Sequence, residues 1–112
     1  MVLKMVNYIH DLLENNECGG FYQFAKPIVN MAFPPLTWQT YDIDYTPAKY
    51  DGDKKVENMR VTVRHNGVVI HDNVELPNAT PGQEGEENEA RPLFLQGHGN
   101  HDQYRNIWVQ YK

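Results

Sequence analysis

The sequence predicts an all-β fold, and three observations carry that prediction. From residue 38 onward, larger apolar side chains alternate with polar ones, which is the period of a strand with one buried face. Asn66-Gly67 stands between two apolar runs, and this dipeptide is the strongest short signal for a two-residue β-hairpin. Glycine and proline residues separate the remaining runs, as they do between strands. The 112 residues, 40% of them hydrophobic, suffice for one core, so we predict a single domain over residues 1–112.

The N-terminal segment has a helical rather than a strand pattern. Apolar residues recur at intervals of three and four between residues 2 and 14, and Gly19-Gly20 follows as a stop signal. The spacing predicts a short amphipathic helix within residues 1–16. Its apolar stripe would have to cover a face or an edge of the sheet.

The central strands are predicted from alternation and turn signals. Residues 38–45 put Tyr41 and Ile43 on one face, which we expect to pack inward, and Pro47 with the turn at residues 51–53 ends this strand. Residues 60–65 form the first arm of the hairpin. A two-residue turn pairs His65 with Val68, Val63 with Ile70 and Val61 with Asp72. The expected core face of the hairpin is then Val61, Val63, Val68 and Ile70, and the opposite face carries Thr62, Arg64, Val69 and His71.

The C-terminal third combines a long loop with two predicted strands. Residues 75–92 contain several prolines and glycines together with Glu84, Glu86, Glu87 and Glu89, and they show no periodicity. A loop of this length is either functional or a solvated, mobile connection. Residues 93–96 and 104–111 then read as the last two strands, joined by residues 97–103.

Composition excludes several classes of partner. The formal net charge is −5, whereas nucleic-acid binding needs clustered Lys and Arg, so we expect no nucleic-acid partner. No apolar run approaches the length of a membrane span, and the N-terminus lacks the features of a signal peptide. Cys18 is the only cysteine, so no intrachain disulfide can form.

We expect no cofactor and no metal ligands. His65, His71, His98 and His101 supply ligand types, but no pair has a recognised metal-binding spacing. A divalent cation at the carboxylates of the acidic loop is the alternative, since hard cations prefer oxygen ligands.

The loop after residue 96 is the first candidate for chemistry. Gly97 and Gly99 flank His98, so a ligand can approach this imidazole closely. A histidine that titrates near neutrality suits a general base, and Arg105 could hold a hydroxyl or enolate-like oxygen. The alternatives stay open: His98 and Asn100 could simply bond the backbone of a tight turn, and Arg105 could form an ion pair within the fold.

Three segments resemble a known family. They are residues 35–43 (PLTWQTYDI), residues 61–68 (VTVRHNGV) and residues 93–109, which include Leu93-Phe94-Leu95-Gln96-Gly97-His98-Gly99-Asn100. In order and spacing, residues 17–111 resemble the C-terminal half of the 3-keto-disaccharide hydrolase family. The resemblance implies a concanavalin-like jelly-roll sandwich, incomplete in this chain, whose exposed edges would favour a homodimer or larger homo-oligomer.

The same resemblance implies further site residues. It places a strand at residues 18–23, which makes Tyr22 and Gln23 candidate ligand contacts, with ordinary strand packing as the alternative. It also offers a divergent strand in place of the N-terminal helix. Asn100 and His71 complete the expected ligand contacts. Relatives are often exported, which suggests a secreted or periplasmic protein.

Function follows from the resemblance as an expectation. The chain would act on 3-keto-glycosides as a hydrolase or lyase, with His98 and Arg105 as catalytic residues, because a ketone at C3 acidifies the C2 hydrogen enough for a histidine base. A conventional glycosidase would need two carboxylates across the scissile bond, and no such pair stands out. The alternatives are a non-catalytic carbohydrate-binding module, with Trp108 either stacked on a sugar or packed in the core, and a truncated half-sandwich that self-assembles.

Overall fold

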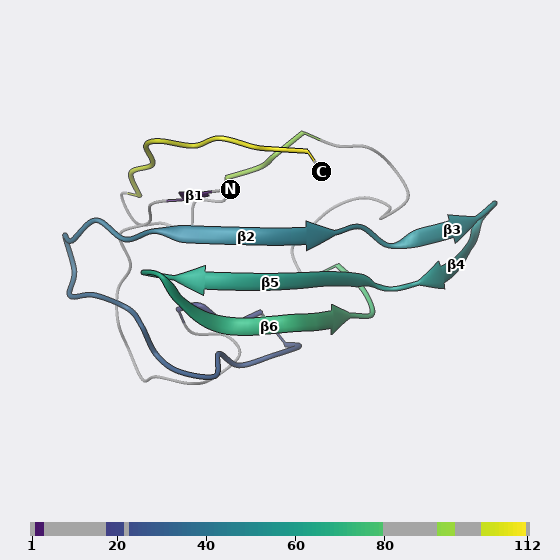
Figure 1. Cartoon of the computed structure of the whole chain (residues 1–112), viewed down its shortest axis with the longest axis horizontal. Coiled ribbons are helices and arrows are strands. Elements are labelled where there is room, and N and C mark those ends of the chain that lie inside the picture. Colours follow the sequence, from purple (N-terminus) through teal and green to yellow (C-terminus); the bar gives the residue numbers. More distant parts are fainter. Residues whose placement is uncertain (1, 4–17, 22, 80–91, 96–101, 112) are drawn as a thin grey trace.

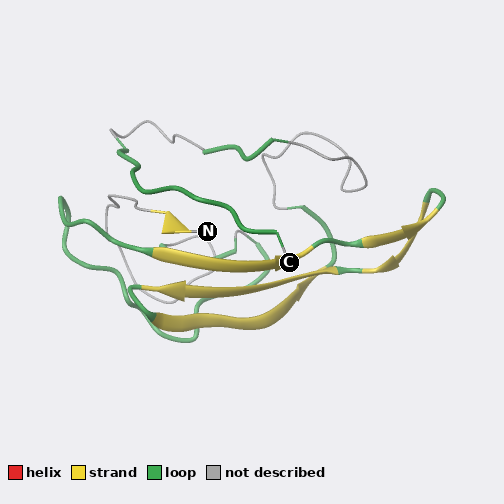
Figure 2. Cartoon of the chain, turned by 45° about the horizontal axis from the view of Figure 1, so that its top comes forward, coloured by secondary structure: helices red, strands yellow, loops and turns green. Residues whose placement is uncertain are grey.

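The computed structural model describes residues 2–3, 18–21, 23–79, 92–95 and 102–111, and within these ranges the chain is all-β (Figures 1 and 2). Its strands are β1 (Val2–Leu3), β2 (Tyr41–Thr46), β3 (Lys49–Asp51), β4 (Lys54–Glu57), β5 (Met59–His65) and β6 (Val68–Leu76). No helix occurs in the described ranges, and therefore none there could cross a membrane. The predicted fold class is confirmed.

The strands form two antiparallel sheets. The larger sheet has the order β1-β2-β5-β6, and the smaller one is the hairpin of β3 and β4, which projects from one end of the molecule in Figure 1. The described strands do not close into a barrel, so they fit an incomplete sandwich. Jelly-roll connectivity stays a prediction.

The central hairpin was predicted correctly at its turn and wrongly in its register. Asn66 and Gly67 have φ values of 51° and 83°, as a two-residue turn between twisted strands requires, and His65 pairs with Val68. Two irregularities then shift β6, so that Val63 pairs with His71 instead of Ile70, and Val61 with Val74 instead of Asp72. Strand β6 therefore carries two residues more than its partner, which is how β-bulges arise.

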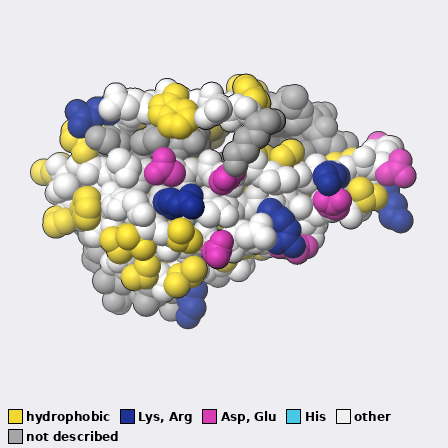
Figure 3. Space-filling model, in the orientation of Figure 1, with side chains coloured by type: hydrophobic (Ala, Val, Ile, Leu, Met, Phe, Trp, Pro, Cys, Tyr) yellow, Lys and Arg dark blue, Asp and Glu magenta, His cyan; other side chains and the backbone are white. Residues whose placement is uncertain are grey.

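The core lies on one face of the larger sheet. Strand β5 alternates strictly, with Met59, Val61, Val63 and His65 buried and the residues between them more exposed. Tyr41 from β2 and Ile70 and Leu76 from β6 complete the buried set, and Phe21, Phe24 and Met31 from the preceding segment pack against it. The opposite face carries acidic and basic side chains over the middle strands (Figure 3). The buried apolar cluster therefore lies on a single face of the sheet.

Two residues of the hairpin differ in burial from the prediction. Val68 is 39% exposed although it was assigned to the core, whereas His71 is buried although it was assigned to the opposite face. The bulge explains His71, because a slip of one residue moves a side chain to the other face of the sheet.

Several predicted strands are absent from the described residues. Residues 93–95 and 104–111 have no strand pairing, and Asn106 lies in a bend with a φ of 55°; residues 18–21 and 23–25 form turns and a single bridge, Phe21 with Ala25. Strand β2 begins at Tyr41 rather than at residue 38, and the turn at Gly52-Asp53 joins β3 to β4. Val2–Leu3 is a strand and not the start of a helix, while the rest of the predicted helix lies outside the described residues.

Candidate functional site

The sequence-predicted site is described only in part. His98, Asn100 and Tyr22 lie outside the described residues, as does most of the acidic loop. Arg105, Gln23 and His71 are described, and they occupy three different environments. Catalytic and ligand-binding roles for all six residues stay predictions.

Arg105 lies on an aromatic ring. Its guanidinium carbon is 3.9 Å from the centroid of the Trp38 ring, the distance of a close cation–π contact. The Arg105 side chain is exposed and Trp38 is half-buried. In the described part of the chain no carboxylate forms an ion pair with Arg105. A cation–π contact uses the positive charge of the guanidinium, and the N–H groups lie in the guanidinium plane, where oxygen atoms can be bound.

The backbone next to Trp38 is fixed by a buried hydrogen-bonding centre. The Gln39 Oε1 atom accepts from the backbone N–H of Phe33 (2.9 Å), from His65 Nε2 (2.8 Å) and from Asn66 Nδ2 (3.3 Å). The backbone N–H of Thr40 donates to Asn66 Oδ1, and the backbone N–H of Asn66 donates to the Thr40 carbonyl. Residues 39 and 40 are therefore tied to the β5–β6 turn.

Gln23 lies in a tight turn and not in a strand. Its φ of 66° is the left-handed conformation, and the backbone N–H groups of Phe24 and Ala25 both donate to the Phe21 carbonyl across the turn. The Gln23 side chain is exposed. Among the described residues, no contact joins the Gln23 side chain to Arg105.

His71 lies beneath the segment that contains Gly19 and Phe21. The side chain is 1% exposed, its Nε2 is 2.5 Å from the Gly19 carbonyl oxygen, and its ring centroid is 4.3 Å from that of Phe21. A carbonyl only accepts, so Nε2 carries the proton. Burial lowers the pKa of His71, although the bond to Gly19 acts in the opposite direction. A ligand could reach this imidazole only after the overlying segment moved.

A second buried imidazole belongs to the same face of the sheet. His65 is 1% exposed and stacks on Tyr41 with 4.3 Å between centroids and 11° between planes. Burial lowers the pKa of His65. Burial, and secondarily the neighbouring Cys18 at 3.5 Å from the hydroxyl, raises the pKa of Tyr41. His65 and Tyr41 are therefore uncharged near pH 7, and they suit support of the fold better than proton transfer to a substrate.

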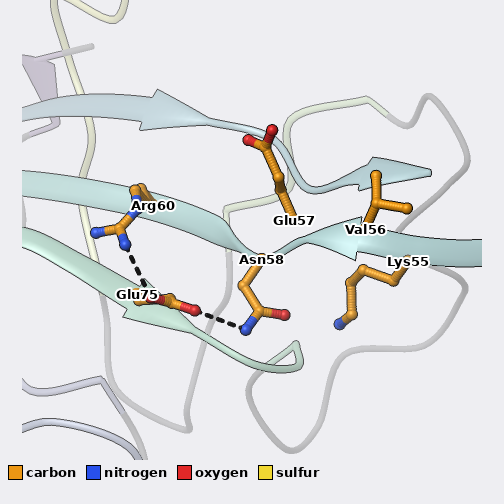
Figure 4. A pocket seen from close by; sticks show the side chains of 6 residues that line it. All are labelled: Lys55, Val56, Glu57, Asn58, Arg60 and Glu75. Carbon is orange, nitrogen blue, oxygen red and sulfur yellow. Dashed lines mark hydrogen bonds and ion pairs between the residues drawn. The ribbon is translucent and has the colours of Figure 1, made fainter. Parts of the chain in front are cut away.

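A polar pocket of about 510 Å³ lies where the β3–β4 hairpin meets β5 and β6 (Figure 4). Its lining comprises Lys55, Val56, Glu57, Asn58, Arg60 and Glu75. Arg60 pairs with Glu75 at 2.8 Å, Asn58 donates to the same carboxylate at 2.8 Å, and Glu57 pairs with Lys49 at 2.9 Å. A ligand would have to compete with these existing contacts, so we assign them to holding the end of the sheet.

The described residues bring no three His, Cys, Asp or Glu side chains together in a metal-binding arrangement. The predicted cation alternative falls on the acidic loop, most of which lies outside the described residues.

Sequence reasoning did not identify the Trp38–Arg105 pair or the Gln39 centre. Both join residues that are distant in the chain, and no local spacing signals such a contact. The one available signal was the Asn66-Gly67 turn, which fixes the position of one member of the centre.

Comparison with known proteins gives one match. A family model described as a 3-keto-alpha-glucoside-1,2-lyase-like domain matches residues 3–110. The match extends N-terminal of residue 17, where the sequence resemblance had begun. No match was found among curated proteins or among solved structures.

Proposed function

Because the chain belongs to the 3-keto-alpha-glucoside-1,2-lyase-like domain family, we propose that it acts on 3-keto-glycosides as a lyase or hydrolase. The family match over residues 3–110 is the observation that carries this proposal, and it indicates a carbohydrate-related activity. The exposed, ring-supported guanidinium of Arg105 adds a group that can bind sugar oxygens.

The proposed chemistry is an elimination. A base removes the C2 hydrogen, which the neighbouring C3 ketone acidifies, and the electrons form an enolate. The enolate then expels the C1 substituent, which leaves with a proton, and addition of water to the resulting double bond would complete a hydrolysis. One base and one group that stabilises the enolate oxygen suffice for this sequence.

We assign the base to His98 and the enolate-stabilising role to Arg105. His98 is flanked by two glycines, and a histidine side chain is the type that suits proton abstraction near neutrality. His65 and His71 are poorer candidates, because both are buried and already hydrogen-bonded. A guanidinium carries a positive charge and several N–H donors, so Arg105 can stabilise the enolate oxygen.

The test is turnover of a chromogenic 3-keto-glucoside by the wild-type chain, His98→Ala and Arg105→Gln. We expect a loss of at least about a hundredfold in kcat/KM for His98→Ala, as removal of a general base typically causes. His101→Ala serves as a nearby histidine control, and the corresponding glucoside without the ketone should not react. Unchanged turnover by folded His98→Ala would refute the assignment of the base.

The proposal includes no cofactor. Turnover that survives dialysis against a chelator is the expected result. Loss of turnover that is restored by a divalent cation would instead support the cation alternative.

A carbohydrate-binding module without catalysis is the second candidate. It is favoured by exposed aromatic rings in the C-terminal part of the chain, namely Phe94 (70% exposed), Trp108 (53%) and Tyr111 (93%). Such rings can stack on sugar faces, and the exposure of Trp108 shows that it is not a core residue. Saturable sugar binding without any turnover would favour this candidate.

Self-association is a further proposal. The exposed apolar residues of the segment 107–111 are the surface that a second copy could cover. Sedimentation at micromolar concentration tests it, and a stable monomer would refute it.

A further inference from the structure

We infer that Trp38 is a positioning residue that acts through Arg105, an inference that rests on the proposed function. The indole ring of Trp38 holds the guanidinium in one orientation, so that its N–H edge is presented to two neighbouring oxygen atoms of a keto-sugar. Trp38 itself need not touch the substrate.

The first step of the argument is the contact itself. A free arginine side chain has considerable rotamer freedom, worth about 2 kcal/mol, which binding would otherwise have to remove. The guanidinium carbon lies over the indole ring at 3.9 Å from its centroid, and this contact restricts the side chain. The described structure thus preorders Arg105 before any ligand arrives.

The second step is that the platform is rigid. Trp38 directly precedes Gln39, whose buried Oε1 accepts three hydrogen bonds, and Thr40 exchanges two more with Asn66. This network joins the backbone next to Trp38 to the turn between the two longest strands. A rigid support is what precise placement of a binding group requires.

The third step concerns the donors of Arg105. The cation–π contact does not require the N–H donors, and within the described ranges no carboxylate pairs with them. A guanidinium edge binds two oxygens that are close together and coplanar. In a 3-keto-sugar the ketone oxygen and the hydroxyl oxygen on an adjacent carbon offer such a pair, which makes this the ligand class that the site suits.

The experiment is a double-mutant cycle on turnover of 3-keto-glucoside, with Trp38→Leu, Arg105→Gln and the double variant. Trp38→Leu should lower kcat/KM about three- to thirtyfold, which corresponds to a cation–π contact. It should have almost no further effect in the Arg105→Gln background, because its action passes through Arg105. Trp38→Phe should recover part of the activity. Tyr45→Leu, which removes a half-exposed aromatic ring from β2, should leave kcat/KM unchanged.

A separate readout does not depend on activity. The side-chain protons of Arg105 should show an upfield ring-current shift in nuclear magnetic resonance spectra, and Trp38→Leu should abolish it. Thermal denaturation shows whether Trp38→Leu folds. If it does not, the milder Trp38→Phe variant is used for both the kinetic cycle and the ring-current measurement.

The outcomes separate the two claims. Three results would each overturn the inference while the wild-type activity stands. They are independent, multiplicative effects of Trp38→Leu and Arg105→Gln on kcat/KM, unchanged turnover by Trp38→Leu, and the absence of a ring-current shift in the wild type. A wild-type chain that shows the ring-current shift but neither binds nor converts a 3-keto-glucoside would overturn the proposed function, and the positioning role would fall with it.

Discussion

Mild acid should destabilise this protein through two buried histidines. His65 and His71 are each 1% exposed, and their Nε2 atoms bond neutral oxygens, those of the Gln39 amide and the Gly19 carbonyl. No carboxylate among the described residues pairs with either ring. Burial therefore lowers both pKa values below the usual value of 6.5, because the charged imidazolium loses hydration without gaining a counter-charge.

The sign of the effect follows from proton uptake. Between the lowered pKa of the folded state and 6.5, the unfolded chain binds more protons than the folded protein. The two neutral histidines contribute their full stabilisation above pH 6.5. This contribution is lost as the pH falls from 6.5 toward the pKa values of the folded state. Each histidine changes the free energy of unfolding by at most about 1.36 kcal/mol per pH unit. The two together can remove at most about 2.7 kcal/mol per unit within that window.

Urea unfolding at pH 7.5, 6.5 and 5.5 measures this loss. Most carboxylates stay ionised over this pH range, so histidine titration dominates the change in the free energy of unfolding. The control is a double variant, His65→Gln with His71→Gln, which keeps a side-chain N–H donor toward each oxygen but cannot titrate. It should be less stable at pH 7.5 and have a flatter pH dependence. Equal slopes for wild type and variant would refute the assignment.

Three further predictions concern packing and charge. Ile70→Ala should lower the free energy of unfolding by about 2–5 kcal/mol in urea titrations, whereas Val68→Ala, at a more exposed position of the same strand, should cost less than about 1 kcal/mol; similar losses would refute the described core. Gly19→Ala should destabilise the protein more than Gly52→Ala, since both have positive φ but only at Gly19 would the new Cβ meet Ile70 Cδ1 at 2.9 Å, and thermal denaturation of the two variants gives the comparison. Glu75→Gln should change the unfolding free energy by less than about 1 kcal/mol, because its ion pair with Arg60 is about half exposed, and a larger loss would contradict this small contribution of the pair.

The parts of the fold that depend on local chemistry were predictable. The turn at Asn66-Gly67 needs positive φ at both positions, and asparagine and glycine are the residues that allow it. The alternation of β5 was equally direct, since one face of this strand is buried along its whole length. These features do not depend on distant residues.

The C-terminal strands were not predictable in the same way. Residues 104–111 have a strand-like sequence, but a strand exists only when another chain segment supplies hydrogen bonds, and no described segment pairs with them. Arg105 illustrates the same limit for the site. Its sequence context suggested an ion pair or a ligand contact, whereas its described partner is Trp38, brought to it by the fold.

The register of β6 decides both the position of His71 and the character of the sheet edge. The first extra residue in β6 turns His71 inward, and Asn73, with a φ of 47°, lies at the second irregularity, where its N–H donates to Thr62 Oγ1. Asparagine tolerates this conformation better than most residues, so it was the one sequence signal for the shift. The same irregular stretch carries exposed Asp72 and Glu75, and both bulges and charges hinder pairing of a sheet edge with another chain. If the protein self-associates, the contact is therefore expected at the exposed apolar residues 107–111 and not along β6.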